Sequence, residues 1–185
     1  MIGSQLKKIQ LLIFTLLLAA CGASSQDVAL HQAVRDNDPQ AVEQLLTDGA
    51  DANAPETAAT TALDTDSTAI IIAAGKQYVE IVDILIANGA DVNATSIYGT
   101  TALGEAAIKG NNDIIALLLD AGADVNTANK WGKTPLMWAA DSGKIDTVML
   151  LLAEGADPSF VDEDGVSALD FAKESGYDEI VGLLE

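Results

Sequence analysis

The amino-acid sequence predicts an all-α solenoid of five helix–turn–helix repeats with β-hairpin-like fingers between them. The main observation is a repeated tripeptide, because Gly-Ala-Asp begins at positions 49, 89, 122 and 155, at intervals of 40, 33 and 33 residues. A fixed period of about 20 to 50 residues is the sequence signature of a repeat array. The second observation is that each period holds two short apolar stretches with the spacing of amphipathic helices.

The first helix of each repeat is predicted from two apolar columns three positions apart. The columns are Leu30, Ile70, Leu103, Leu136, Leu169 and Ala33, Ala73, Ala106, Ala139, Ala172. Residues three apart share one helix face, and small alanine side chains let neighbouring helices approach closely. Thr134 suits the N-cap of such a helix and Pro135 its first turn, where no backbone N–H is required. Asp38-Pro39 has the same chemistry at the start of a second helix.

A turn follows the first helix at a position where helices commonly end in a left-handed residue. This position holds Gly110, Gly143 and Gly176, but Asn37 and Gln77 in the first two repeats. The second helix carries apolar pairs three residues apart: Val42/Leu45, Val82/Leu85, Ile115/Leu118, Val148/Leu151 and Val181/Leu184. Helices of about 8–10 residues are marginal alone in water. Stability must therefore come from stacking the repeats on a shared core.

The segment 134–140, Thr-Pro-Leu-Met-Trp-Ala-Ala, resembles the T-P-L-H-x-A-A core of ankyrin repeats. More divergent copies occupy 101–107, 68–74, 167–173 and 28–34. The five repeats are expected at about 27–54, 55–94, 95–127, 128–160 and 161–185, so that residues 27–185 form one domain. The second repeat has an insertion of about seven residues between Ala54 and Ser67. This insertion either extends the binding face or is a tolerated surface loop.

Residues 1–21 have the pattern of an export signal, with Lys7 and Lys8 before an apolar run of about 12 residues. Spanning a bilayer takes about 20 residues, which disfavours a permanent membrane helix. Leu18-Ala19-Ala20-Cys21 resembles the bacterial lipobox, which implies cleavage before Cys21 and acylation of that residue. We expect a periplasmic lipoprotein on a membrane, with Gly22 favouring the outer membrane and residues 22–26 as a short tether. The alternative is a plain signal peptide and a soluble periplasmic protein.

The exported part is strongly acidic, because 28 acidic but only 7 basic residues follow Cys21. A surface with this field repels nucleic acid and attracts basic partners. We therefore expect a protein partner with a basic surface and no nucleic-acid binding. The alternative is that the charge only keeps the repeats soluble.

A catalytic site is not predicted. His31 is the sole histidine, and the resemblance implies a structural role for it, a hydrogen bond to the neighbouring repeat. Cys21 is expected to be acylated, so no Cys–His pair is available. Gly132-Lys133-Thr134 resembles the end of a phosphate-binding loop, but the upstream glycine would fall at Thr127. We expect no enzyme activity and no cofactor.

A metal site is not predicted either. Asp162-Glu163-Asp164-Gly165 resembles part of a calcium loop, but the first ligand position would fall on Phe160. The spacing of zinc ligands is absent from the sequence. Weak surface binding of calcium by clustered carboxylates is the alternative.

The ankyrin resemblance implies that finger tips and the exposed side of the first helices form a concave binding face. Carried over by position, this face consists of Ile97, Tyr98, Thr100, Lys130, Trp131, Lys133, Trp138, Asp141, Ser142, Glu163 and Asp164, with Glu174 and Ser175 beyond them. The main candidates for partner contact are Tyr98, Trp131 and Trp138, because large aromatics are over-represented in binding hot spots. The alternatives are that Tyr98 and Trp131 pack between adjacent fingers and that Trp138 packs against the next repeat.

Two kinds of function fit these expectations. The first is a monomeric adaptor, inhibitor or immunity-type protein that binds a protein partner in the periplasm. The second is a structural or accessory scaffold for the envelope or for a periplasmic redox enzyme.

Overall fold

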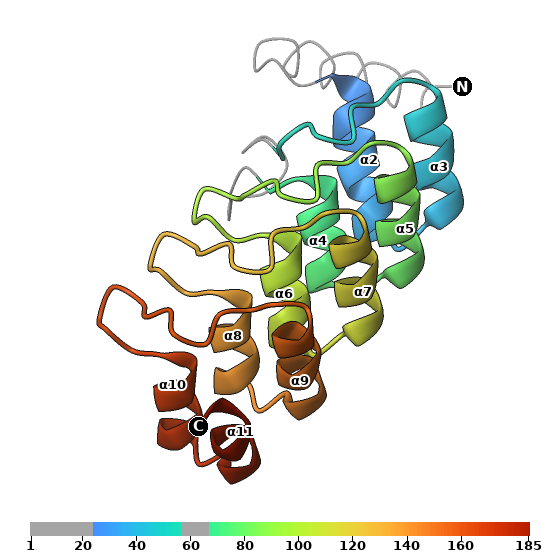
Figure 1. The fold of residues 1–185 in the computed structure, drawn as a ribbon. Coiled ribbons are helices and arrows are strands. Elements are labelled where there is room, and N and C mark those ends of the chain that lie inside the picture. The colour runs from blue at the N-terminus through green and yellow to red at the C-terminus, as the bar shows by residue number, and fades with distance from the viewer. Residues whose placement is uncertain (1–23, 57–66) are drawn as a thin grey trace, which may run out of the picture.

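The computed structural model describes residues 24–56 and 67–185, which form a solenoid of paired helices (Figure 1). The helices are α2 (Ser25–Arg35), α3 (Pro39–Thr47), α4 (Ala69–Gly75), α5 (Val79–Ala87), α6 (Ala102–Lys109), α7 (Asn112–Asp120), α8 (Pro135–Asp141), α9 (Ile145–Ala153), α10 (Ala168–Ser175) and α11 (Asp178–Leu184). Each first helix contacts the first helix of the next pair, and each second helix contacts the next second helix. The predicted all-α solenoid of five repeats is confirmed.

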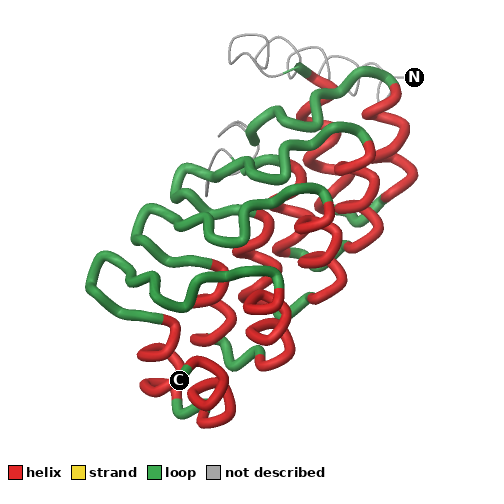
Figure 2. Tube along the Cα trace, viewed as in Figure 1, coloured by secondary structure: helices red, strands yellow, loops and turns green. Residues whose placement is uncertain are grey.

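The described parts of the long loops between repeats project from the same side of the solenoid (Figure 2). Three of these fingers are closed across the turn by backbone hydrogen bonds, from Ser96 to Thr100, Asn129 to Lys133 and Asp162 to Val166. Among the described residues, ladder geometry is limited to one antiparallel bridge between Val161 and Ser167. The fingers are thus hairpin-like turns and not strands.

The first helix begins earlier than the sequence suggested. The Ser24 hydroxyl accepts from the Asp27 N–H, and the Asp27 carboxylate accepts from the Ser24 N–H. This capping box starts α2 at Ser25, inside the segment 22–26 that was expected to be a tether. Residues 1–23, including the predicted signal and Cys21, lie outside the described residues, as do residues 57–66 of the insertion.

The short helices begin and end as the sequence chemistry predicts. Thr134 caps α8 through its hydroxyl, and Asp38 caps α3 ahead of Pro39. Gly110 closes α6 in the left-handed region, at a φ of 74°. Asn37 and Gln77 also adopt positive φ angles, 54° and 65°, so the turn keeps its shape without glycine.

The core follows the predicted columns, with exceptions in the end repeats. The alanine column is buried throughout, and the leucine column is buried from Leu30 to Leu136. Leu169 and Val181, in the fifth repeat, are half-buried. The reason is that this repeat has a described neighbour on one side only. Within the described ranges, no helix combines the length and the apolar character that crossing a membrane requires.

An asparagine ladder, which was not predicted from the sequence, links successive repeats. The Asn93 side chain donates to the Gly122 carbonyl (3.1 Å) and accepts from the Asp124 N–H (2.8 Å). Asn53 and Asn126 make the same pair of bonds to the repeats that follow them. Each asparagine follows its Gly-Ala-Asp at a fixed offset, a regularity visible in the sequence.

His31 is buried, as its place in the first repeat suggested, but its expected hydrogen bond is wrong. Its Nδ1 donates to the Asp27 carbonyl of its own helix (2.8 Å) and not to the neighbouring repeat. Its Nε2 has no partner among the described residues. Burial lowers the pKa of His31 below its usual value of 6.5, so the imidazole is held neutral.

Candidate functional site

Backbone hydrogen bonds join the last three fingers to one another. The Lys130 N–H donates to the Tyr98 carbonyl, and the Glu163 N–H donates to the Trp131 carbonyl, both at 3.0 Å. Gly132 allows this contact, because a Cβ at that position would lie 3.0 Å from the Asp162 Cα. The fingers therefore form one continuous surface.

Polar side chains inside each finger fix the shape of its tip. The Asn129 Oδ1 accepts from the N–H groups of Trp131 and Lys133. The Asp162 Oδ1 makes the same two bonds one repeat later, to Asp164 and Val166. These residues were missed as determinants of the site, although each stands three positions before a finger glycine.

Tyr98 and Trp131 meet across two fingers. Their rings stack with centroids 5.7 Å apart and planes inclined by 18°. The two residues still expose 43% and 48% of their surfaces. The two rings therefore pack between adjacent fingers, as one of the alternatives above expected, and both remain partly exposed.

Trp138 is half-buried and packs against the core. The Lys133 ammonium lies over its ring, 4.8 Å from the centroid, and also over the ring of Phe171, at 4.1 Å. The lysine is thus held between aromatic rings of two successive repeats, an arrangement that favours a cation. The contact between Lys133 and Phe171 was not predicted from the sequence.

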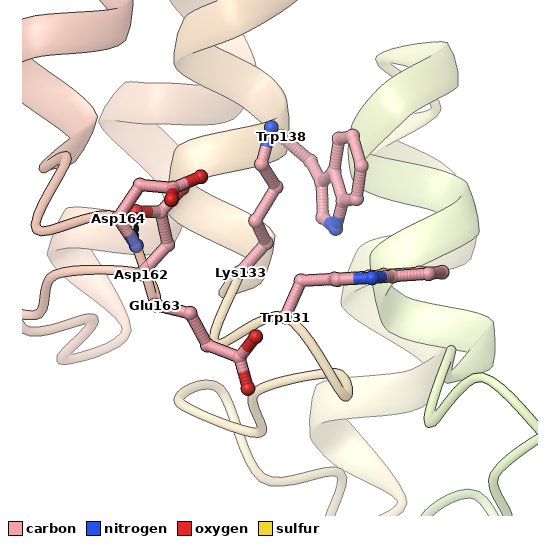
Figure 3. A pocket seen from close by; sticks show the side chains of 6 residues that line it. All are labelled: Trp131, Lys133, Trp138, Asp162, Glu163 and Asp164. Carbon is pink, nitrogen blue, oxygen red and sulfur yellow. Dashed lines mark hydrogen bonds between the residues drawn. The ribbon is translucent and has the colours of Figure 1, made fainter.

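A pocket of about 290 Å³ opens between the fourth and fifth fingers. We call it the finger pocket (Figure 3). It is lined by Trp131, Lys133, Trp138, Asp162, Glu163 and Asp164. In Figure 3 the Trp131 ring is seen edge-on below Trp138, and the three acidic residues lie across the pocket from the two indoles. The sequence placed all of these on the binding face except Asp162.

The pocket has an excess of negative charge. One lysine and three carboxylates line it, which gives a formal balance of −2. Asp162 is only 9% exposed, whereas Glu163 and Asp164 are exposed. The ion pairs found among the described residues, Arg35–Glu56 and Lys173–Glu185, do not involve any of the three.

The comparison with family models agrees with this architecture. A model of ankyrin repeats in three copies matches residues 30–129 and again residues 126–185. The chain belongs to the ankyrin repeat family. Comparison with curated proteins finds no match. Ankyrin repeats are in general modules for protein–protein interaction, and the family is typically non-enzymatic.

Other residues of the expected ankyrin binding face lie outside the finger pocket. Ile97 and Lys130 are exposed on neighbouring fingers. Thr100 lines a narrow cleft beside Trp138. Asp141 and Ser142 are half-buried at the end of α8, where Asp141 accepts from the Ser175 hydroxyl at 3.5 Å. Glu174 is exposed further along α10.

Glu105 stands in the third ankyrin repeat where Trp138 stands in the fourth. Burial raises the pKa of its carboxyl above the usual 4.5, an effect that Lys109 partly offsets. In residues 24–56 and 67–185, no group of three or more His, Cys, Asp or Glu side chains is arranged so that it could hold a metal ion. The Asp162–Gly165 segment, considered above as a calcium loop, forms the fifth finger turn.

Proposed function

We propose that this ankyrin repeat protein binds a protein partner through the finger pocket and the adjoining Tyr98–Trp131 stack. The observation that supports this most directly is the gathering of two tryptophans, Trp131 on a finger and Trp138 on α8, with three carboxylates around one pocket. Aromatic anchors in a pocket dominate the binding energy of many interfaces. The pocket, of about 290 Å³, lies at the lower end of the range of about 300–1,000 Å³ for ligand pockets and is large enough to admit one side chain of a partner.

The acidic surface favours a partner with a basic face. Electrostatic complementarity mainly accelerates association and selects among partners. An adaptor, inhibitor or immunity-type role requires one selective partner. The scaffold role, for an envelope component or a periplasmic redox enzyme, would instead involve several weak ones.

The protein is proposed to act in a bacterial periplasm, tethered to the outer membrane by acyl chains on Cys21. The support is the lipobox-like segment at 18–21. Two or more acyl chains anchor a protein far more stably than one. The Cys21→Ser variant should lose label from radioactive palmitate and leave the membrane fraction, and a variant that keeps both would contradict the anchor.

Partner capture tests the binding proposal. The full chain and its Trp131→Ala variant are used as baits, and captured proteins are quantified by mass spectrometry. Met149→Ala is a matched control, because Met149 is also a large exposed apolar residue (45%) but lies on α9, outside the pocket. A partner lost from Trp131→Ala and kept by Met149→Ala supports the proposal, whereas equal capture by both contradicts it.

A further inference from the structure

We propose that the finger pocket receives one arginine side chain of the protein partner, held between the Trp131 indole and the pocket carboxylates. This inference rests on the proposed function, because it names the part of the partner that enters. The group that enters the pocket is a guanidinium, which is more specific than a general attraction between an acidic and a basic surface.

The first argument is the unbalanced charge of Asp162. This carboxylate is nine-tenths buried, and its Oδ1 is held by two backbone N–H groups of the finger turn. No cationic side chain among the described residues forms an ion pair with it. One added cation would bring the formal charge of the lining from −2 to −1 and give Asp162 a counterion.

The second argument is that the same pocket already holds a cation. The Lys133 ammonium lies over the rings of Trp138 and Phe171. The aromatic surface here therefore has the electrostatic character that cations select. Lys133 occupies the Trp138 side, so the Trp131 side is available to a second positive group.

The third argument is that Trp131 remains partly exposed. Stacking on Tyr98 engages one face of the indole, yet nearly half of the residue stays exposed. A planar guanidinium can stack on an indole face and at the same time pair with carboxylates through its edge. The compact, strongly hydrated ammonium of lysine satisfies these contacts less well. The geometry thus favours arginine over lysine.

The test uses the full chain in dodecyl maltoside and the peptide acetyl-Gly-Arg-Gly-amide. The matched peptide carries citrulline, which has the shape of arginine but no charge. Tryptophan fluorescence is a local readout, because the chain has two tryptophans and both line the pocket. The arginine peptide should give a saturable change with an affinity about tenfold higher than that of the citrulline peptide.

Two matched variants separate the pocket from the general acidity. Asp162→Asn removes the charge and should keep the turn, because Asn129 makes the same two backbone bonds in the preceding finger. Asp157→Asn removes the same charge from an exposed turn outside the pocket, where Asp157 accepts from Ser159. Arginine-peptide affinity should fall about tenfold in Asp162→Asn and stay near wild type in Asp157→Asn. Lys133→Gln should tighten binding, since it removes a like charge.

Equal binding of the two peptides would overturn the proposal, as would equal losses in the two variants. Failure here is distinguishable from failure of the proposed function. If Trp131→Ala loses its protein partner but the arginine and citrulline peptides bind equally, the finger pocket is the partner-binding surface and the arginine proposal is wrong. If selectivity is found but capture is unaffected by Trp131→Ala, the pocket chemistry stands and the proposed function does not.

Discussion

The ring of Tyr98 stacks on the ring of Trp131, 33 positions later in the chain, with centroids 5.7 Å apart. The two residues occupy neighbouring fingers, whose backbones are joined by the bond from Lys130 to Tyr98. The stack therefore supports the wall of the finger pocket from the repeat before it.

Replacing Tyr98 by alanine should weaken partner capture several-fold with a small effect on folding. A stacked aromatic pair contributes about 0.5–1.5 kcal/mol beyond its buried area. Because the pair is exposed, the free energy of unfolding in urea should fall by no more than about 1 kcal/mol. Tryptophan emission should shift to the red as Trp131 becomes more exposed. Unchanged emission would show that the stack does not order Trp131.

Gly132→Ala should damage the site, whereas Gly165→Ala should not. Both glycines have positive φ angles, 78° and 79°, so each alanine variant carries about 1–2 kcal/mol of left-handed strain. Only at Gly132 would the new Cβ meet the next finger, while nothing lies within 4 Å at Gly165. Partner capture should therefore drop for Gly132→Ala alone. Similar capture by the two variants would mean that the spacing between fingers does not shape the site.

Asn93→Ala should destabilise the solenoid by about 1–2 kcal/mol, because two hydrogen bonds between repeats are lost and each contributes about 0.5–1.5 kcal/mol. Asn88→Ala is the control, since the Asn88 side chain bonds only to the Ile84 carbonyl of its own repeat. Urea unfolding followed by circular dichroism measures both. Equal losses would show that the ladder adds nothing specific to stacking.

The fold could be predicted because each repeat contains the same apolar columns and the same turn position. Columns such as Ala33 to Ala172 and the left-handed position of Asn37 needed only the period and the chemistry of single residues. The finger pocket could not be assembled in this way, because it depends on how far neighbouring fingers approach. In the sequence Asp162 was considered only as part of a resemblance to a calcium loop, and its burial becomes apparent only once the fourth finger packs beside it.

The missed features were of two kinds. The asparagine ladder was visible, since Asn53, Asn93 and Asn126 recur at one offset, and Ser159 replaces them in the last copy. The placement of Lys133 between Trp138 and Phe171 was not visible, because it depends on the rotamer of a long side chain between two helices.

Acidification should destabilise the protein through His31. Burial lowers the folded-state pKa of His31, so below about pH 6.5 the unfolded state binds a proton more readily. Stability is then lost as the pH falls toward the folded pKa, by at most about 1.4 kcal/mol per pH unit. Glu105 acts in the opposite direction, because its raised pKa favours the folded state on acidification. Urea unfolding between pH 7.5 and 5 should show a steeper loss for the wild type than for His31→Gln, which keeps Glu105. Parallel curves would contradict a buried neutral histidine.

The most direct test of the central claim is site-specific photo-crosslinking in cells. A benzoylphenylalanine is placed at Ile97, beside Tyr98 on the finger face, or at Met149 on α9. Both residues are exposed and apolar, at 37% and 45%. A partner that binds the finger face should be crosslinked in high yield from position 97 and not from position 149. A partner crosslinked from position 149 and not from position 97 would contradict the account.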